Sequence, residues 1–193
     1  MSKPLFIYVH GFNSSPDSFK ARLLVDWLTR QGREDEVLVP ELSHWPLQAM
    51  TTLESLVTQY AERDIILLGS SLGGFYSTYL VEKYNLKCVL INPAVRPYEL
   101  LEELLGDNEN IYTGERYQLT REHLQQLLAL KCENLKDLSR YLLLTQTDDE
   151  VLDYRQAVEL FQGAEMVIQQ GGSHGFDEFE KVLPVIEQFA QRP

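Results

Sequence analysis

The sequence predicts an α/β fold, in which a mostly parallel sheet of about six strands is sandwiched between helices. Two observations lead to this prediction. Short runs that are almost entirely apolar alternate with longer segments whose apolar residues recur at helical spacing. The short runs do not alternate apolar and polar residues, so both faces of each strand are expected to be buried. Helices between strands form right-handed crossovers, which place neighbouring strands parallel.

Each element of this fold can be assigned from its own pattern. The strands are expected at residues 5–9, 37–40, 65–68, 88–93, 141–146 and 166–169. The first helix is expected to begin at Ser15-Pro16, because serine caps helices and proline suits their first turn. Further amphipathic helices are expected over residues 48–63, after the third strand, after Asp153, and over residues 177–191.

One segment, residues 96–137, interrupts the alternation because it is longer than an ordinary crossover. It holds two helical patterns, residues 98–105 and 120–130, around the turn-rich residues 106–114. An insertion after the fourth strand would lie above the carboxyl ends of the strands, where ligands bind in open α/β sheets. We therefore expect one domain, residues 1–193, with this segment as a cap. The alternative is a pair of helices packed at the side of the sheet.

Composition and charge exclude several classes of function. The 193 residues suffice for one domain with a substantial core, and the net charge is −12. So acidic a chain is poorly suited to sequence-independent binding of nucleic acid, and no stretch is long enough to span a membrane. Of the two cysteines, neither stands in a zinc-binding pattern, and Cys88 is expected in the core. Without a signal-peptide layout at the N-terminus, a cytoplasmic location is expected.

The motif that suggests chemistry is Gly-x-Ser-x-Gly, centred on Ser71 between an apolar run and a helical pattern. In such a turn the serine is forced out over the end of the sheet with its hydroxyl exposed. A side chain at Gly69 or Gly73 would collide within the turn. A phosphate-binding loop is disfavoured, because Phe75 stands where that motif requires lysine. Short glycine–serine patterns also arise by chance, so the partners of Ser71 decide its interpretation.

A serine hydroxyl needs a base to act as a nucleophile near neutral pH. His174 is the expected base, because it lies between glycines in a loop just past the last predicted strand. Asp149, in the loop after the fifth strand, is the expected carboxylate that orients the histidine, and Asp148 is the alternative. A buried aspartate would fix the tautomer of the imidazole and stabilise its positive charge. Asp153, by contrast, is expected to cap the next helix.

The reaction would also need fixed N–H donors for the oxyanion. One donor is expected from Leu72, directly after the nucleophile, and the other from Phe12 in the loop after the first strand. For His10, at the start of that loop, we expect structural support rather than proton transfer. His123 is expected at the surface of a helix, and the position of His44 carries no prediction.

The order Ser71, Asp149, His174 is that of the α/β-hydrolase superfamily, which the sequence resembles over nearly its whole length. Four stretches, at residues 10–16, 69–74, 92–97 and 149–155, more closely resemble the small bacterial YqiA-type esterase family. The sequence departs from larger members of the superfamily in starting at the strand that carries the oxyanion loop, so we expect a minimal fold without the two usual leading strands. The resemblance implies esterase activity that extends to acyl thioesters such as acyl-CoA, with Ser71 as nucleophile, Asp149 as acid and His174 as base.

We therefore expect a serine hydrolase that cleaves small carboxylic esters or acyl thioesters through an acyl-enzyme, with no metal or cofactor. Two alternatives remain. One is a non-hydrolytic member of the fold that binds a ligand or a partner protein. The other is a different acyl-transfer activity, such as that of a peptidase or an acyltransferase. The sequence carries no prediction of the oligomeric state.

Overall fold

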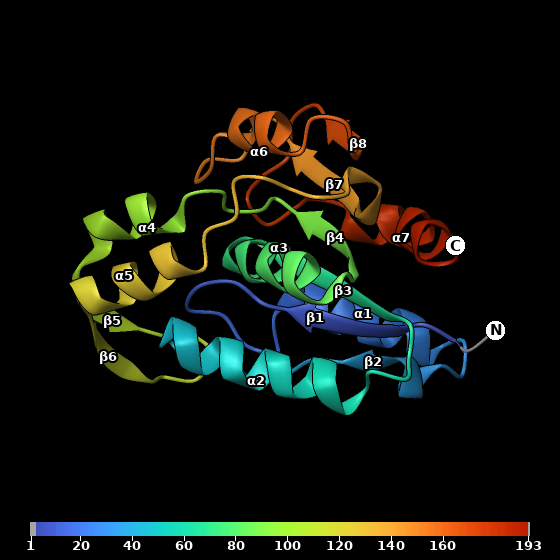
Figure 1. Cartoon of the computed structure of the whole chain (residues 1–193), viewed down its shortest axis with the longest axis horizontal. Coiled ribbons are helices and arrows are strands. Elements are labelled where there is room, and N and C mark those ends of the chain that lie inside the picture. The colour runs from blue at the N-terminus through green and yellow to red at the C-terminus, as the bar shows by residue number, and fades with distance from the viewer. Residues whose placement is uncertain (1–2, 193) are drawn as a thin grey trace.

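A computed structural model describes residues 3–192 of the chain (Figure 1). Within these residues the main sheet has six strands in the order β2-β1-β3-β4-β7-β8. All neighbouring strands in it are parallel, which confirms the predicted fold class. The strands are β1 (Leu5–Val9), β2 (Val37–Leu38), β3 (Ile65–Ser70), β4 (Lys87–Ile91), β7 (Tyr141–Gln146) and β8 (Glu165–Gln169).

Helices cover both faces of this sheet. Alternate residues of β1 and β3 belong to two separate clusters of buried side chains, one with α1 and α7 and the other with α2, α3 and α6. None of the helices within residues 3–192 is long and apolar enough to cross a membrane. The helices are α1 (Phe19–Thr29), α2 (Pro46–Gln59), α3 (Leu72–Tyr84), α6 (Tyr154–Leu160) and α7 (Leu183–Ala190), with short 3₁₀ turns η1 (Glu34–Glu36), η3 (Leu138–Arg140) and η4 (Phe179–Val182).

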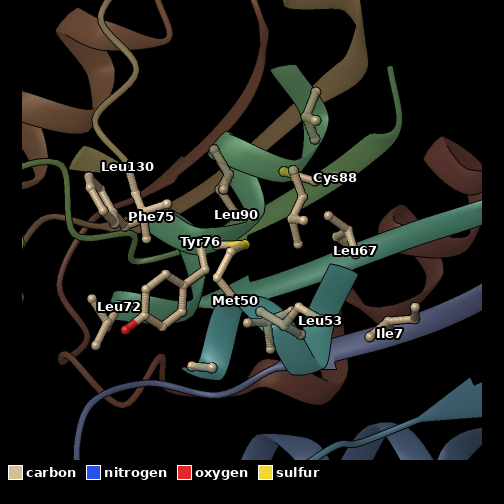
Figure 2. Close-up of a cluster of buried hydrophobic side chains, with 14 of the residues drawn as sticks. Ile7, Met50, Leu53, Leu67, Leu72, Phe75, Tyr76, Cys88, Leu90 and Leu130 are labelled. Carbon is tan, nitrogen blue, oxygen red and sulfur yellow. The ribbon is translucent and has the colours of Figure 1, made fainter. Parts of the chain in front are cut away.

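The cluster on the α2 and α3 face fixes the helix that follows the Gly-x-Ser-x-Gly motif. Figure 2 shows side chains from α2, α3 and the strands converging there, among them Met50, Tyr76 and Leu67. Cys88 is fully buried in the same cluster, as predicted. Burial of each large apolar side chain contributes ~1.5–3 kcal/mol to folding. The start of α3 is therefore attached to the sheet by a substantial apolar contact.

Strand register brings the candidate loops to one edge of the sheet. Ser70 at the end of β3 pairs with Ile91 at the end of β4, and Ile91 pairs with Leu144 of β7. Gln146 at the end of β7 pairs with Gln169 at the end of β8. The loops that follow these four strands consequently leave the sheet side by side, which is the geometry that a composite site requires.

Helices α1 and α7 differ most from the predictions, each for a local reason, and α2 begins and ends a few residues ahead of its expected range, 48–63. Helix α1 begins at Phe19, not at Ser15, because the Ser15 hydroxyl accepts a hydrogen bond from the Asp17 N–H and closes a turn ahead of the helix. The expected helix over residues 177–191 is divided into η4 and α7. Pro184 lies in the first turn of α7, where its missing N–H and its ring are tolerated.

The inserted segment, residues 96–137, lies at one end of the molecule, toward which the arrows of β4 and β7 point (Figure 1). Its second predicted helix is present, but the first is reduced to two short turns. Its turn-rich middle is an antiparallel hairpin that the sequence did not predict. The elements of the segment are α4 (Pro97–Leu100), η2 (Leu101–Leu104), β5 (Gly106–Glu109), β6 (Arg116–Leu119) and α5 (Arg121–Ala129).

The predicted surface position of His123 is wrong, because its side chain is 0% exposed. Its ring stacks on Trp45 with 3.7 Å between centroids, and its Nε2 lies 3.1 Å from Nδ1 of His44. Its Nδ1 accepts a hydrogen bond of 3.1 Å from the Thr120 N–H at the start of α5. This cluster joins the inserted segment to the loop before α2. Burial lowers the pKa of both His44 and His123.

The lowered pKa values predict how stability depends on pH. Since the folded protein disfavours the protonated form of His44 and His123, the unfolded chain binds more protons below about pH 6.5, the ordinary pKa of histidine. The free energy of unfolding should thus fall as pH is lowered from 7 to 5. Each of these histidines contributes a slope of at most ~1.4 kcal/mol per pH unit.

Urea denaturation at pH 5, 6 and 7 would measure this dependence. His123→Gln keeps a polar side chain at a capping-box position but removes the titrating group, so its slope should be smaller than that of the native chain. Leu24→Ala, in the buried cluster with α1 and α7, is the control, which should lower stability at all three pH values without changing the slope. An unchanged slope in His123→Gln would contradict the prediction.

Candidate active site

Ser71 occupies a strained turn between β3 and α3. Its backbone has φ 54° and ψ −119°, a region that costs a non-glycine residue ~1–3 kcal/mol. Main-chain hydrogen bonds hold it there: the Ser71 N–H donates to the Ile91 carbonyl at 3.1 Å, and the Ser71 carbonyl accepts from Gly74 and Ala94 at 2.9 and 3.0 Å. The predicted strand–turn–helix arrangement is confirmed, and the backbone of the serine is held by α3, by the end of β4 and by the loop after β4.

The glycines of the motif allow the chain to turn this tightly. A Cβ atom at Gly73 would lie 1.9 Å from the carbonyl oxygen of Val9, at the end of β1. A Cβ atom at Gly69 would lie 2.5 Å from the carbonyl oxygen of Gly73 and from Oγ of Ser77. Both distances are far below van der Waals contact, so the predicted steric requirement at these positions is confirmed. The first turn of α3 packs directly against the backbone of β1.

The three residues predicted to carry the chemistry lie in one chain of hydrogen bonds. Nε2 of His174 is 3.1 Å from Oγ of Ser71, and Nδ1 of His174 is 2.8 Å from Oδ2 of Asp149. The Asp149 side chain is 1% exposed and that of His174 is 23% exposed. These distances suit transfer of a proton from the serine hydroxyl to the imidazole. The catalytic roles themselves stay predictions.

Asp149, not Asp148, contacts the histidine. Burial acts to raise the pKa of Asp149, but the hydrogen bond from His174 and the N–H groups of Leu152 and Val151 outweigh it and hold that pKa below its usual value. These two N–H groups donate to Oδ1 at 2.8 and 2.9 Å. Asp148 is exposed, and its Oδ1 accepts from the Thr147 hydroxyl at 3.1 Å. An ionised, fixed carboxylate thus faces the imidazole.

The two predicted oxyanion donors belong to two segments that meet at the serine. Leu72 follows it at the start of α3, and Phe12 lies in the loop between β1 and α1. That loop passes directly beside the serine, because a Cβ atom at Gly11 would lie 3.1 Å from Cβ of Ser71. Within residues 3–192 the N–H groups of Phe12 and Leu72 have no hydrogen-bond acceptor. Both residues border a cavity of about 30 Å³, near the volume of one water molecule.

His10 supports this loop, as predicted. It is buried at 4% exposure, and the Leu42 N–H donates to its Nε2 at 3.3 Å while its Nδ1 lies 3.0 Å from the Gly11 carbonyl. The imidazole that fits both contacts is neutral, with its proton on Nδ1. Burial lowers the pKa of His10, which favours that neutral form. Both ring nitrogens are occupied, so the residue is a structural link between the loops after β1 and β2.

Two buried residues that the sequence did not single out hold the His174 loop. Asn92, at φ 40° after β4, donates from Nδ2 to the carbonyls of Ser173 and His174 at 2.9 and 3.2 Å. Gln146, the last residue of β7, accepts on Oε1 from the N–H groups of Ser173 and Asp177 at 3.0 and 2.9 Å. Both are polar residues at the carboxyl ends of buried strands. That position is the one feature of the sequence that could have identified them as part of the site.

Two charged side chains hold the same loop from outside. Glu150 accepts a hydrogen bond of 2.9 Å from the His174 N–H, and Nζ of Lys20 on α1 donates to the Gly175 carbonyl at 2.8 Å. Burial lowers the pKa of Lys20 to about 8, although the negative charge of Asp149 acts in the opposite direction. The backbone on either side of the imidazole is therefore anchored. Among residues 3–192, no group of three or more His, Cys, Asp or Glu side chains could hold a metal ion.

Comparisons with known proteins agree with this architecture. A family model described as an uncharacterised protein family, UPF0227, matches residues 5–191. A UPF0227 protein of Vibrio parahaemolyticus is 23% identical over 190 residues, which cover 96% of this chain and 98% of that protein.

Solved structures with the same fold include α/β-hydrolase domain-containing protein 10 from mouse. It has a TM-score of 0.76 at 16% identity and covers 97% of this chain and 90% of its own. Est1E from Butyrivibrio proteoclasticus has a TM-score of 0.74 at 19% identity, over 97% of this chain and 87% of its own. The predicted likeness to the α/β-hydrolase superfamily and to its small bacterial YqiA-type branch is confirmed.

The close contact at Gly73 leads to a prediction about stability. Gly73→Ala would place a methyl group against the backbone of β1, so either that strand or α3 must move. We expect a loss of more than ~3 kcal/mol in the free energy of unfolding, measured by urea denaturation. Gly175→Ala is the matched control. Its methyl group would meet only Oγ of Ser173 at 3.3 Å, and it should cost less than ~1 kcal/mol.

Proposed function

The chain belongs to the uncharacterised protein family UPF0227, and we propose that it is a serine hydrolase of carboxylic esters or acyl thioesters. One observation carries the proposal. Ser71, His174 and Asp149 come from loops after three different strands, yet they form a continuous chain of hydrogen bonds at the carboxyl edge of the sheet. Such a chain provides what a serine nucleophile requires, namely a base in contact with it and a carboxylate that orients the base.

The reaction begins with attack of Oγ of Ser71 on the acyl carbon, while Nε2 of His174 accepts the hydroxyl proton. The carboxylate of Asp149 stabilises the imidazolium that forms. His174 then donates this proton to the departing alcohol or thiol, which leaves the acyl group on Ser71. Water attacks the acyl-enzyme after losing a proton to the same imidazole, which returns that proton to Oγ of Ser71 as the carboxylic acid departs.

The negative charge on the carbonyl oxygen in both steps would be held by the N–H groups of Phe12 and Leu72. Backbone donors suit this task because they are fixed before the reaction begins. Leu72 is also the first residue of α3, and the N-terminus of a helix carries partial positive charge. Loss of one such donor typically slows an enzyme ~100- to 1,000-fold.

We further propose that residues 1–193 form one domain and that residues 96–137 are its cap. Support comes from a cavity of about 260 Å³ between this segment and the loop after β7. Ala94, which donates a hydrogen bond to the Ser71 carbonyl, lies on its wall together with Leu100 and Leu152. One residue of its wall thus contacts the main chain of Ser71, and part of a small-molecule substrate could bind in this cavity. The cytoplasmic location stays a prediction.

A fluorophosphonate probe tests the proposal directly, because it phosphonylates serines that are activated by a histidine. We expect stoichiometric labelling at Ser71, mapped by mass spectrometry of peptides. With p-nitrophenyl esters and acyl-CoA thioesters of graded chain length as substrates, Ser71→Ala and His174→Ala should lower kcat more than ~1,000-fold, and Asp149→Asn ~1,000- to 10,000-fold.

Asp148→Asn is the matched control, since this neighbouring carboxylate is exposed and does not contact the histidine. Its kcat should stay within ~3-fold of the native value. Folded protein that is not labelled at Ser71 would refute the proposal and favour a non-hydrolytic, ligand-binding protein. So would ester turnover that persists in the Ser71, Asp149 and His174 variants.

A further inference from the structure

The β5–β6 hairpin of the inserted segment contacts the loop that carries the proposed oxyanion donor Phe12. The Tyr117 hydroxyl donates to Oδ1 of Asn13 at 2.7 Å. Nδ2 of Asn110 donates to the Ser14 carbonyl at 2.9 Å, and Nδ2 of Asn13 lies 3.4 Å from Oδ1 of Asn108. These contacts join residues about a hundred positions apart in the chain, and all of them fall on the two residues that follow Phe12.

Asn13 needs such support because its backbone is in the left-handed region, at φ 49°. Asparagine adopts this conformation more readily than most residues, but other conformations remain accessible to an unconstrained loop. The loop also lies outside the sheet, so no neighbouring strand orders it. His10 holds the peptide group before Phe12 through the Gly11 carbonyl, and the direction of the peptide group after Phe12 depends on what holds the Asn13 side chain.

Tyr117 is itself held in place by a stack of rings. Its ring lies on His44 with 4.0 Å between centroids and 17° between planes. His44 is hydrogen-bonded to His123, which in turn stacks on Trp45. This stack restricts the Tyr117 ring to one orientation and so directs its hydroxyl at Asn13. Burial raises the pKa of Tyr117 to about 12, so the hydroxyl keeps its proton, and remains a donor, across the range in which a histidine base works.

We propose that Tyr117 is a positioning residue that fixes the Phe12 N–H of the oxyanion site through its hydrogen bond to Asn13. On this view the inserted segment completes the catalytic site as well as covering it. The inference rests on the proposed function, because it requires an oxyanion next to Ser71. It adds a role for a side chain whose hydroxyl bonds to Asn13 and to none of the three residues of the hydrogen-bonded chain within residues 3–192.

The proposal predicts a specific kinetic defect. The oxyanion forms in the tetrahedral intermediates and in the transition states around them but not in bound substrate, so a misplaced donor should lower kcat while leaving ground-state binding almost unchanged. For Tyr117→Phe, which removes the hydroxyl and keeps the ring on His44, we expect kcat to fall ~10- to 100-fold and KM to change less than ~3-fold. If Tyr117 had a purely structural role, its loss would lower stability and the amount of active protein. The kcat of each remaining active site would then stay at the native value.

The experiment measures kcat and KM for p-nitrophenyl acetate, the concentration of active sites by fluorophosphonate titration, and the inhibition constant of a trifluoromethyl ketone. This inhibitor adds to a serine nucleophile and forms an oxyanion, so its affinity should fall by the same factor as kcat/KM. Tyr112→Phe is the matched control on the same hairpin, half exposed and with no hydrogen bond from its hydroxyl within residues 3–192. It should match the native protein in every measurement.

Asn13→Ala tests the same hydrogen bond from its acceptor side. It also keeps the inference testable if Tyr117→Phe does not fold. It removes the acceptor and should show the same loss of kcat and of inhibitor affinity. The double variant should be no slower than Asn13→Ala alone, because both changes remove one interaction. Native kcat and inhibitor affinity in folded Tyr117→Phe or Asn13→Ala would overturn the inference. Absence of Ser71 labelling in the native chain would instead refute the proposed function.

Discussion

The turn at Ser71 is the constraint on which the rest of the site depends. Its left-handed backbone is possible because Gly73 lets the first turn of α3 approach the end of β1 without a side chain between them. Hydrogen bonds to Ile91 and from Ala94 then join this turn to the end of β4. The position of the hydroxyl is therefore set by main-chain contacts among three elements. His174, Asp149 and Phe12 must thus approach this hydroxyl from loops that follow other strands.

The loop that carries His174 meets this requirement through buried amides. Asn92 and Gln146 leave the sheet at the ends of β4 and β7 and use both the donor and the acceptor of their side chains on neighbouring polar groups. A buried amide with unmet hydrogen bonds would be costly, so each satisfied contact favours one position of the loop. This network orients the histidine, while its two ring nitrogens contact Ser71 and Asp149.

The sequence could predict those features that depend on residues close together in the chain. Ser71 follows β3 directly, and Asp149 and His174 lie in the loops just past β7 and β8, so the strand pattern alone brought the three residues to one edge of the sheet. The burial of His123 could not be predicted in this way. Its partners Trp45 and His44 lie almost eighty residues earlier, and the helical spacing of α5 contains no information about them. Asn92 and Gln146 were missed for a related reason, because their function appears only when two strand ends meet.

The hairpin escaped prediction for a physical reason that also explains its use. Its first strand reads Gly-Asp-Asn-Glu, residues that are depleted in strands because they add little to an apolar core. A strand with polar side chains can instead hydrogen-bond to a neighbouring loop, as Asn108 and Tyr117 do with Asn13. The loop that would supply an oxyanion donor has no sheet neighbour of its own and needs such polar partners. The polar residues of β5 and of the turn after it, together with Tyr117 of β6, allow this hairpin to order the loop beside Ser71.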